Sequence, residues 1–295
     1  MISSRTALGL LALIILPGSC IAAAPDQASS TSQKKSNTAT PVHIGAFKLS
    51  RAPQQGGLVL GTAPPGTTRL VVDGRNVDVA ADGRFIIGFG RDYAAATLVT
   101  AFLENGSQVT EKLPVQPTRW RIESLSSLPH HAQPDAEFQA RRPGELDQIN
   151  AARHRITDAQ GWRQTFIWPV RGRITGHFGA QRIYRGEPGA PHAGVDISGA
   201  TGTPVVAPAD GVVILAATSP FTLEGNLLML DHGMGLNSAF LHLSRIDVKP
   251  GDHVRQGQPI GAVGMSGRAT GPHLHWGMKW RDERIDPGML PAEKR

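Results

Sequence analysis

Cysteine is almost absent from this chain, whose single example is Cys20 near the N-terminus. One thiol cannot form an intrachain disulfide, and it cannot build a zinc site made of several thiolates. If the N-terminal segment is cleaved after Cys20, no thiol nucleophile is left. The sequence therefore excludes a disulfide-stapled scaffold and a thiolate metal centre.

Long hydrophobic runs are also missing. The longest, residues 7–17, follows Arg5 and precedes the small residues 18–24, and it is too short to span a bilayer. This arrangement predicts a secretory signal peptide over residues 1–24. Residues 16–20 also resemble a bacterial lipoprotein cleavage site, so lipidation of Cys20 and membrane association form an alternative. Both predict a protein of the periplasm or cell envelope.

Aromatic residues are few, at 5%, and the formal net charge is +6. A basic chain favours anionic surroundings. The Lys and Arg residues are scattered, however, and no basic motif with interleaved aromatics occurs. We therefore predict no nucleic-acid partner.

The 34 glycines and 22 prolines favour short strands joined by tight turns, and hence a mainly β protein. Residues 25–40 are polar and rich in Ser and Thr, which predicts a disordered tether. Residues 41–120 alternate apolar runs with turn signals such as Asp73-Gly74 and Asn105-Gly106. These predict hairpins and a small β-sandwich-like accessory domain.

Residues 121–164 are predicted to be a linker with a short helix. After Gly144, the residues Leu146, Ile149, Arg153 and Ile156 follow helical spacing. The strand-and-turn pattern then returns, so residues 165–290 are predicted to form an all-β domain.

Metal-ligand side chains gather in this last region. His192 and Asp196 lie four residues apart, and in an extended segment they would share one face. Gly194 between them would leave room for an ion. His273 and His275 obey the same period of two, and His242 lies between the two sets. Two imidazoles and a carboxylate can hold zinc and leave one coordination position for water, which indicates a hydrolase.

Other histidines lack such neighbours. His43, His154 and His253 are interpreted as packing or surface residues. His232 is assigned to a hairpin turn, and His177 is left between a structural and a substrate-side role.

From about Trp168 to Pro287 the sequence resembles the lysostaphin/LytM-type zinc metallopeptidases, peptidase family M23. The matching motifs run in family order, from residues 168–179 through His192-Ala193-Gly194-Val195-Asp196 and residues 240–243 to residues 264–275. The resemblance implies one zinc ion per chain, bound by His192, Asp196 and His275. It implies that the catalytic residues His242 and His273 handle the attacking water and the developing charge.

The resemblance also implies a function. A protein of this kind is expected to be a zinc-dependent endopeptidase that hydrolyses the peptide cross-links of bacterial peptidoglycan through a metal-activated water. Its partners would be the peptide stems and cross-bridges. Two alternatives stay open. One is a non-catalytic relative that regulates or activates other cell-wall hydrolases. The other is a carrier domain, because residues 248–261 resemble the hairpins of biotinyl/lipoyl-like domains.

Two positions depart from the family pattern. Phe240 replaces the tyrosine that is usual two residues before the middle histidine. The tyrosine that some members place before the first ligand has only Tyr184 as a counterpart, in an uncertain register.

Overall fold

The computed structural model describes residues 41–125 and 136–291. The predicted signal peptide (residues 1–24), Cys20 within it and the predicted tether (residues 25–40) lie outside the described residues. Among the described helices, none has the length and apolar character that a membrane crossing requires.

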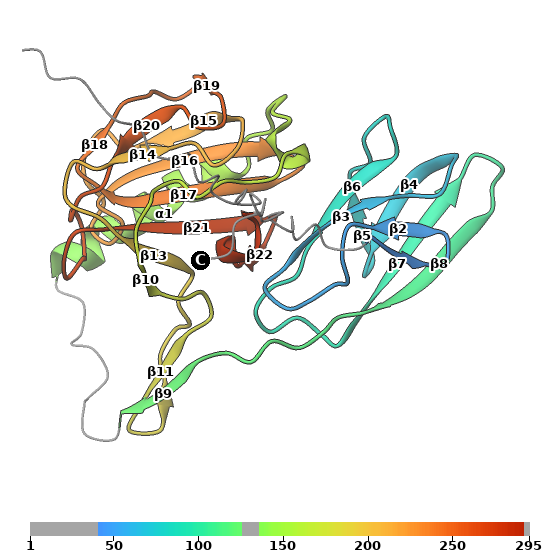
Figure 1. Ribbon diagram of the computed structural model, residues 1–295, viewed down its shortest axis with the longest axis horizontal. Helices are drawn as coiled ribbons and strands as arrows, with labels where there is room; N and C mark the ends of the chain where they lie inside the picture. The colour runs from blue at the N-terminus through green and yellow to red at the C-terminus, as the bar shows by residue number, and fades with distance from the viewer. Residues whose placement is uncertain (1–40, 126–135, 292–295) are drawn as a thin grey trace, which may run out of the picture. The chain divides into compact units, whose positions relative to one another are not determined.

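Two four-stranded antiparallel sheets form the N-terminal β-region, residues 42–114 (Figure 1). The first, in the order β1-β2-β3-β6, contains Val42–Ile44, Phe47–Leu49, Leu58–Thr62 and Arg84–Gly88. The second, in the order β5-β4-β7-β8, contains Arg75–Val77, Thr67–Val72, Ala96–Leu103 and Gln108–Pro114. Asp73 and Gly74 have φ of 45° and 80°, as a type I′ hairpin turn requires. The predicted hairpins and β-rich fold are thus confirmed.

An eight-stranded sheet dominates the C-terminal β-region (Figure 1). Its order is β10-β13-β21-β17-β16-β15-β19, with β22 paired to β21. In that order the strands are Ile174–Gly176, Gly194–Ser198, His273–Trp280, Leu236–Leu243, Asn226–Gly233, Gly211–Ala216 and His253–Val254, and β22 is Glu283–Ile285. The central strands are buried because helix α1 and loops cover the sheet. They therefore carry long apolar runs such as residues 227–230.

Two small sheets complete this region. One, in the order β12-β11-β9, contains Glu187–Pro188, Gln181–Tyr184 and Ile122–Leu125. The other, β14-β20-β18, contains Pro204–Val206, Pro259–Ala262 and Arg245–Ile246. Two 3-10 helices, η1 and η2, cover Gly161–Arg163 and Pro287–Met289. The predicted linker thus contains a strand, because the backbone of β9 pairs in parallel with that of β11.

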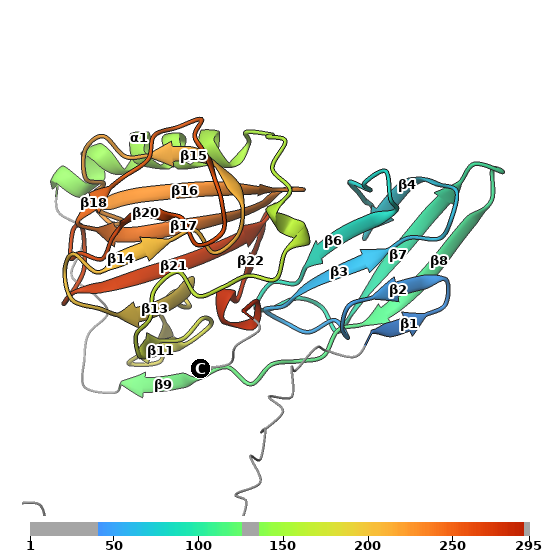
Figure 2. The same cartoon turned by 45° about the horizontal axis from the view of Figure 1, so that its top comes forward.

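The helix that precedes the eight-stranded sheet in the chain is longer than its sequence pattern predicts. Helix α1 runs over Ala136–Arg153 and lies against the sheet beside β15 (Figure 2). Its start is hidden in the sequence because Pro143 and Gly144, both helix breakers, lie inside it. Its buried stripe is Glu145, Ile149 and Ala152.

The predicted apolar face of this helix is partly wrong. Ile156 lies beyond its end and is 98% exposed, and Leu146 is 41% exposed. The stripe that is actually buried includes a carboxylate, which a hydrophobic pattern cannot reveal. Ile149 packs in one cluster with Leu227 and Met229 of β16, so α1 covers part of the sheet face.

Candidate metal centre and active site

The three predicted ligands converge. Asp196 Oδ1 lies 2.9 Å from His275 Nδ1 and 3.2 Å from His192 Nε2, and the two nitrogens lie 3.1 Å apart. Tetrahedral zinc with ligand distances near 2.0–2.1 Å separates its ligand atoms by about 3.3 Å. Two imidazoles and a carboxylate at these separations therefore fit a zinc ion.

Strand register explains most of this convergence. Asp196 of β13 lies directly opposite His275 of β21, and Leu241 of β17 flanks His275 on the other side. Side chains of directly opposed residues lie on the same face of a sheet. His273 also shares this face, with its Nε2 3.8 Å from Asp196 Oδ1. The predicted period of two in His273 and His275 is confirmed.

His192 reaches the site in another way. It precedes β13, so strand alternation does not position it. Its backbone N–H donates to the Ala180 carbonyl, and its own carbonyl accepts from Gly179. Its Nδ1–H donates to the His177 carbonyl at 3.0 Å, which leaves the Nε2 lone pair for a metal. His177 thus contributes through its backbone, a role that the side-chain pattern did not show.

Two glycines make the close approach possible. A Cβ at Gly194 would lie 2.4 Å from the Trp276 carbonyl oxygen and 2.8 Å from His275 Nε2. Gly194 therefore makes room for the partner strand and its histidine. Gly176 is a residue that our sequence reasoning missed: a Cβ there would lie 2.2 Å from Asp196 Oδ2. The run Gly176-His177-Phe178-Gly179 was its only signal.

His242 joins the same face against the alternation of its strand. Leu241 faces the site, so a regular strand would point His242 the other way. Its φ of 63° lies in the left-handed region and turns the side chain back. Its ring centroid lies 4.9 Å from that of His273 and 6.3 Å from that of His275. All five predicted site residues are thus brought together.

Backbone carbonyls fix the tautomers of His242 and His273. His242 Nδ1 lies 2.8 Å from the Ser266 carbonyl, and His273 Nδ1 lies 2.8 Å from the Gly271 carbonyl. A carbonyl only accepts, so each Nδ1 carries the proton and each Nε2 keeps a lone pair. Both rings therefore present a proton acceptor.

Burial and charge shift the titration of the cluster. Burial opposes ionisation of Asp196, but bonds from His192 and His275 outweigh it and hold the pKa of Asp196 well below its usual value. Burial opposes protonation of His192, yet its bond to Asp196 raises the His192 pKa. Burial lowers the pKa of His242, which favours its neutral form at neutral pH.

The two departures from the family pattern lie away from this cluster. Phe240 pairs with Trp276, and both are fully buried on the opposite face of the sheet. A hydroxyl at position 240 would therefore point into the core. Tyr184 is buried in β11, and it is not among the described residues that line the site's cavity.

His232 is fully buried in β16 rather than in a turn, with Nδ1 bonded to the Asp210 carbonyl and Nε2 to Ser238 Oγ.

The five residues open into a cavity of about 510 Å³. Its floor is the sheet face of β16, β17 and β21, and helix α1 contributes Arg142, Ile149 and Arg153 to its wall. A cavity of this size, with a few convergent polar groups, is typical of a ligand site.

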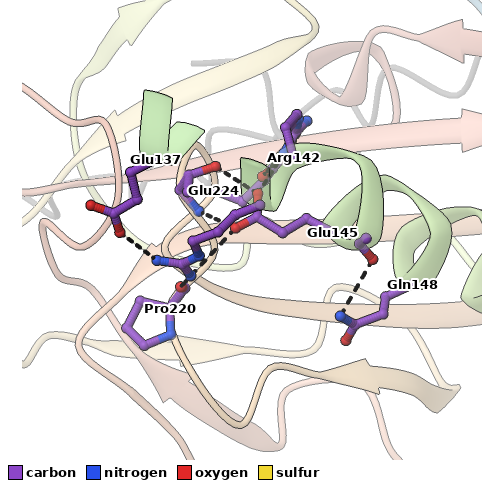
Figure 3. Close-up of polar contacts among 9 residues, drawn as sticks. Glu137, Arg142, Glu145, Gln148, Pro220 and Glu224 are labelled. Carbon is purple, nitrogen blue, oxygen red and sulfur yellow. Dashed lines mark hydrogen bonds and ion pairs between the residues drawn. The ribbon is translucent and has the colours of Figure 1, made fainter. Parts of the chain in front are cut away.

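An ion-pair clamp fastens helix α1 beside the cavity. Arg142 donates two bonds to Glu224, at 2.6 and 2.8 Å, and one to Glu145 at 3.3 Å (Figure 3). Glu145 also accepts from the backbone N–H and hydroxyl of Thr222. The Glu224 carbonyl in turn accepts the N–H of His242 at 2.8 Å. The clamp therefore connects the helix to the segment that holds a site histidine.

We expect Arg142→Ala to destabilise the fold by about 3 kcal/mol, because it leaves the largely buried Glu224 without its guanidinium and removes one of the two that contact Glu145. The matched control is Arg141→Ala on the same helix turn, whose side chain is 43% exposed. It loses a longer contact with Glu145, at 3.4 Å, but leaves Arg142 on both carboxylates, so its loss should cost under about 1 kcal/mol. Urea unfolding measures both free energies. Equal losses in the two variants would contradict the clamp.

Comparisons with known proteins agree with this geometry. The model of peptidase family M23 matches residues 190–287. Peptidoglycan DD-endopeptidase ShyA of Vibrio cholerae is 42% identical over 112 residues, which make up 37% of this chain and 26% of ShyA. Peptidoglycan DD-endopeptidase ShyB of the same organism is 40% identical over 158 residues, 52% of this chain and 33% of ShyB. The chain therefore spans a third or less of the length of these relatives.

A solved structure extends the likeness beyond the matched domain. The crystal structure of a Pseudomonas aeruginosa protein assigned to peptidase M23 has a TM-score of 0.64 and 28% identity. It covers 82% of this chain and 96% of its own. The family match contains all five site residues, within the fold that this neighbour shares. Residues 190–287 of the chain are therefore a domain of peptidase family M23.

Proposed function

We propose that the chain is a zinc-dependent endopeptidase that hydrolyses peptide cross-links of bacterial peptidoglycan in the cell envelope. The observation that carries the proposal is the convergence of His192, Asp196 and His275 beside His242 and His273, where all five line one cavity. The names of ShyA and ShyB support the substrate.

In this proposal, His192 Nε2, Asp196 Oδ1 and His275 Nδ1 hold one zinc ion per chain. Bound zinc supplies a Lewis acid that polarises a carbonyl oxygen and lowers the pKa of water. The carboxylate and the two imidazoles are held before binding, so little side-chain order remains to be lost. The bond of His192 to the His177 carbonyl keeps its ring in the orientation that a ligand needs.

His242 and His273 handle the protons. Each has Nε2 free to accept a proton from an attacking water, because each Nδ1–H is committed to a carbonyl. A protonated ring can then stabilise the developing oxyanion or return the proton to the leaving amine. The 4.9 Å between the two rings allows both to face one scissile bond.

The main alternative is a non-catalytic regulator on the same fold. It predicts a site that has lost ligands or proton acceptors. Here every predicted ligand and both acceptors are present and converge, which favours the enzyme.

Digestion of purified peptidoglycan by the full chain tests the proposal. We expect soluble muropeptides whose masses show cleavage of a peptide bond in the cross-link, with loss of release after treatment with EDTA. A chain that binds zinc and releases no fragment would favour the regulator.

A further inference from the structure

Three cationic side chains line the cavity away from the metal centre. They are Arg153 from the last turn of α1, Lys279 from β21 and Arg284 from β22. Lys279 and Arg284 are direct cross-strand partners, so their Cα atoms lie roughly 5 Å apart. Like charges in this position are destabilising. The fold therefore holds positive charge together at a cost.

No carboxylate forms a direct ion pair with these cations within the described residues. Over residues 41–125 and 136–291, no ion pair joins Arg153, Lys279 or Arg284 to an acidic side chain. Arg153 Nε is buried and has no hydrogen-bond partner. The two carboxylates that line the cavity are already engaged, Asp196 by the histidines and Glu224 by Arg142.

Burial and mutual repulsion lower the pKa of two of these cations. Burial, then the charge of Arg284, lowers the pKa of Arg153, although the charge of Glu224 opposes this. Burial, then the charges of Arg153 and Arg284, lowers the pKa of Lys279, although Asp282 and Glu283 oppose this. A cation in the last turn of a helix interacts favourably with the helix dipole, which suits Arg153. That effect does not account for the buried Nε or for the Lys279–Arg284 pair.

Lys279 and Arg284 lie on the same sheet face as the metal centre, at a distance that strand geometry sets. His275, Gly277 and Lys279 alternate along β21 and so share one face. Four residues of strand put Lys279 roughly 13 Å from His275. Between them on this face of β21 lies Gly277, which has no side chain, and its cross-strand partner Ala239 has a small one. An extended peptide covers this distance in about four residues.

We propose that Arg153, Lys279 and Arg284 form a carboxylate subsite that binds an acidic group of the peptide substrate three to four residues from the scissile bond. This inference rests on the proposed function for the nature of the ligand. Arg and Lys side chains donate charge-assisted hydrogen bonds to a carboxylate, and the buried Nε of Arg153 gains the partner that it lacks. The subsite would make the enzyme select cross-links that carry free carboxylates.

The test compares two ligands and two double variants. The ligands are a cross-linked muropeptide dimer with free carboxylates and the same dimer with its carboxyl groups converted to carboxamides. The subsite variant is Lys279→Gln with Arg284→Gln, which spares the buried Arg153. The matched control is Lys249→Gln with Arg255→Gln, which removes the same charge from exposed positions outside the cavity. Calorimetry on a His273→Ala background measures binding without turnover.

We expect the parent and the control to bind the carboxylate dimer about tenfold more tightly than the carboxamide dimer. The subsite variant should bind both dimers alike, at the weaker value. Equal binding of the two dimers by the parent, or a preference that survives in the subsite variant, would overturn the proposal. Turnover of the carboxylate dimer by the native chain is measured separately. Absence of turnover with the binding preference intact would reject the proposed function and keep the subsite.

Discussion

Asp196→Ala should abolish zinc retention and hydrolysis together. The substitution removes the only carboxylate of the ligand set and leaves two imidazoles, one short of the three protein ligands that hold a catalytic zinc. Loss of the metal removes several kcal/mol of transition-state stabilisation, so turnover should fall by a factor on the order of a thousand or more. Zinc content after dialysis and the rate of muropeptide release measure the two effects.

Two variants sharpen this prediction. Asp196→Asn keeps the shape of the side chain and removes its charge, so it should also lose zinc. Asp247→Ala removes a carboxylate that pairs with Arg245 outside the cavity, and it should keep both zinc and activity. An Asp196→Ala chain that retains one zinc ion at unchanged affinity would show that the ligand set is wrong.

Replacement of His242 or His273 should separate chemistry from metal binding. Neither Nε2 belongs to the ligand set, and general acid–base catalysis contributes about 10²- to 10⁴-fold. His273→Ala should therefore keep one zinc ion and lose turnover by a factor in this range. The dependence of kcat on pH should also lose one limb, because one titrating acceptor is gone.

His242 needs a different substitution because its φ is 63°. Alanine is strained in this region, whereas asparagine tolerates it, so His242→Asn removes the proton acceptor and keeps the backbone. His154→Ala, on an exposed histidine after α1, is the control and should keep full activity. Loss of zinc from His242→Asn would reverse the assignment of ligands.

Local sequence patterns predicted the parts of the site that depend on strands. The period of two placed His273 and His275 on one face, and turn signals such as Asp73-Gly74 marked hairpins that the structure contains. His192 is held by carbonyls of residues 177 and 180, which belong to another segment. His242 depends on a left-handed backbone that its residue type does not require. Neither the contacts that hold His192 nor the backbone conformation of His242 produces a periodic pattern in the sequence.

The carboxylate subsite shows the same limit more strongly. Lys279 and Arg284 meet because of the register between β21 and β22, and Arg153 reaches them because α1 packs on the sheet. The Arg142–Glu224 pair, whose members are 82 residues apart, is one of the contacts that hold α1 there. The start of α1 was hidden by Pro143 and Gly144. A chain of scattered cations thus conceals a local concentration of charge that only the tertiary structure creates.

The domain boundaries that we drew at residues 120 and 165 stay a prediction. Buried residues of both β-regions belong to one hydrophobic cluster, and Arg281 pairs with Asp78 at 2.9 Å.

Titration of zinc into metal-free chain tests the central claim most directly. The chain is stripped with EDTA, and muropeptide release from purified peptidoglycan is measured at each addition of zinc. We predict no release at the start, a linear rise to one equivalent of zinc per chain, and a plateau beyond it. Full release by the stripped chain, or no release at any zinc concentration, would contradict a zinc peptidase centred on His192, Asp196 and His275.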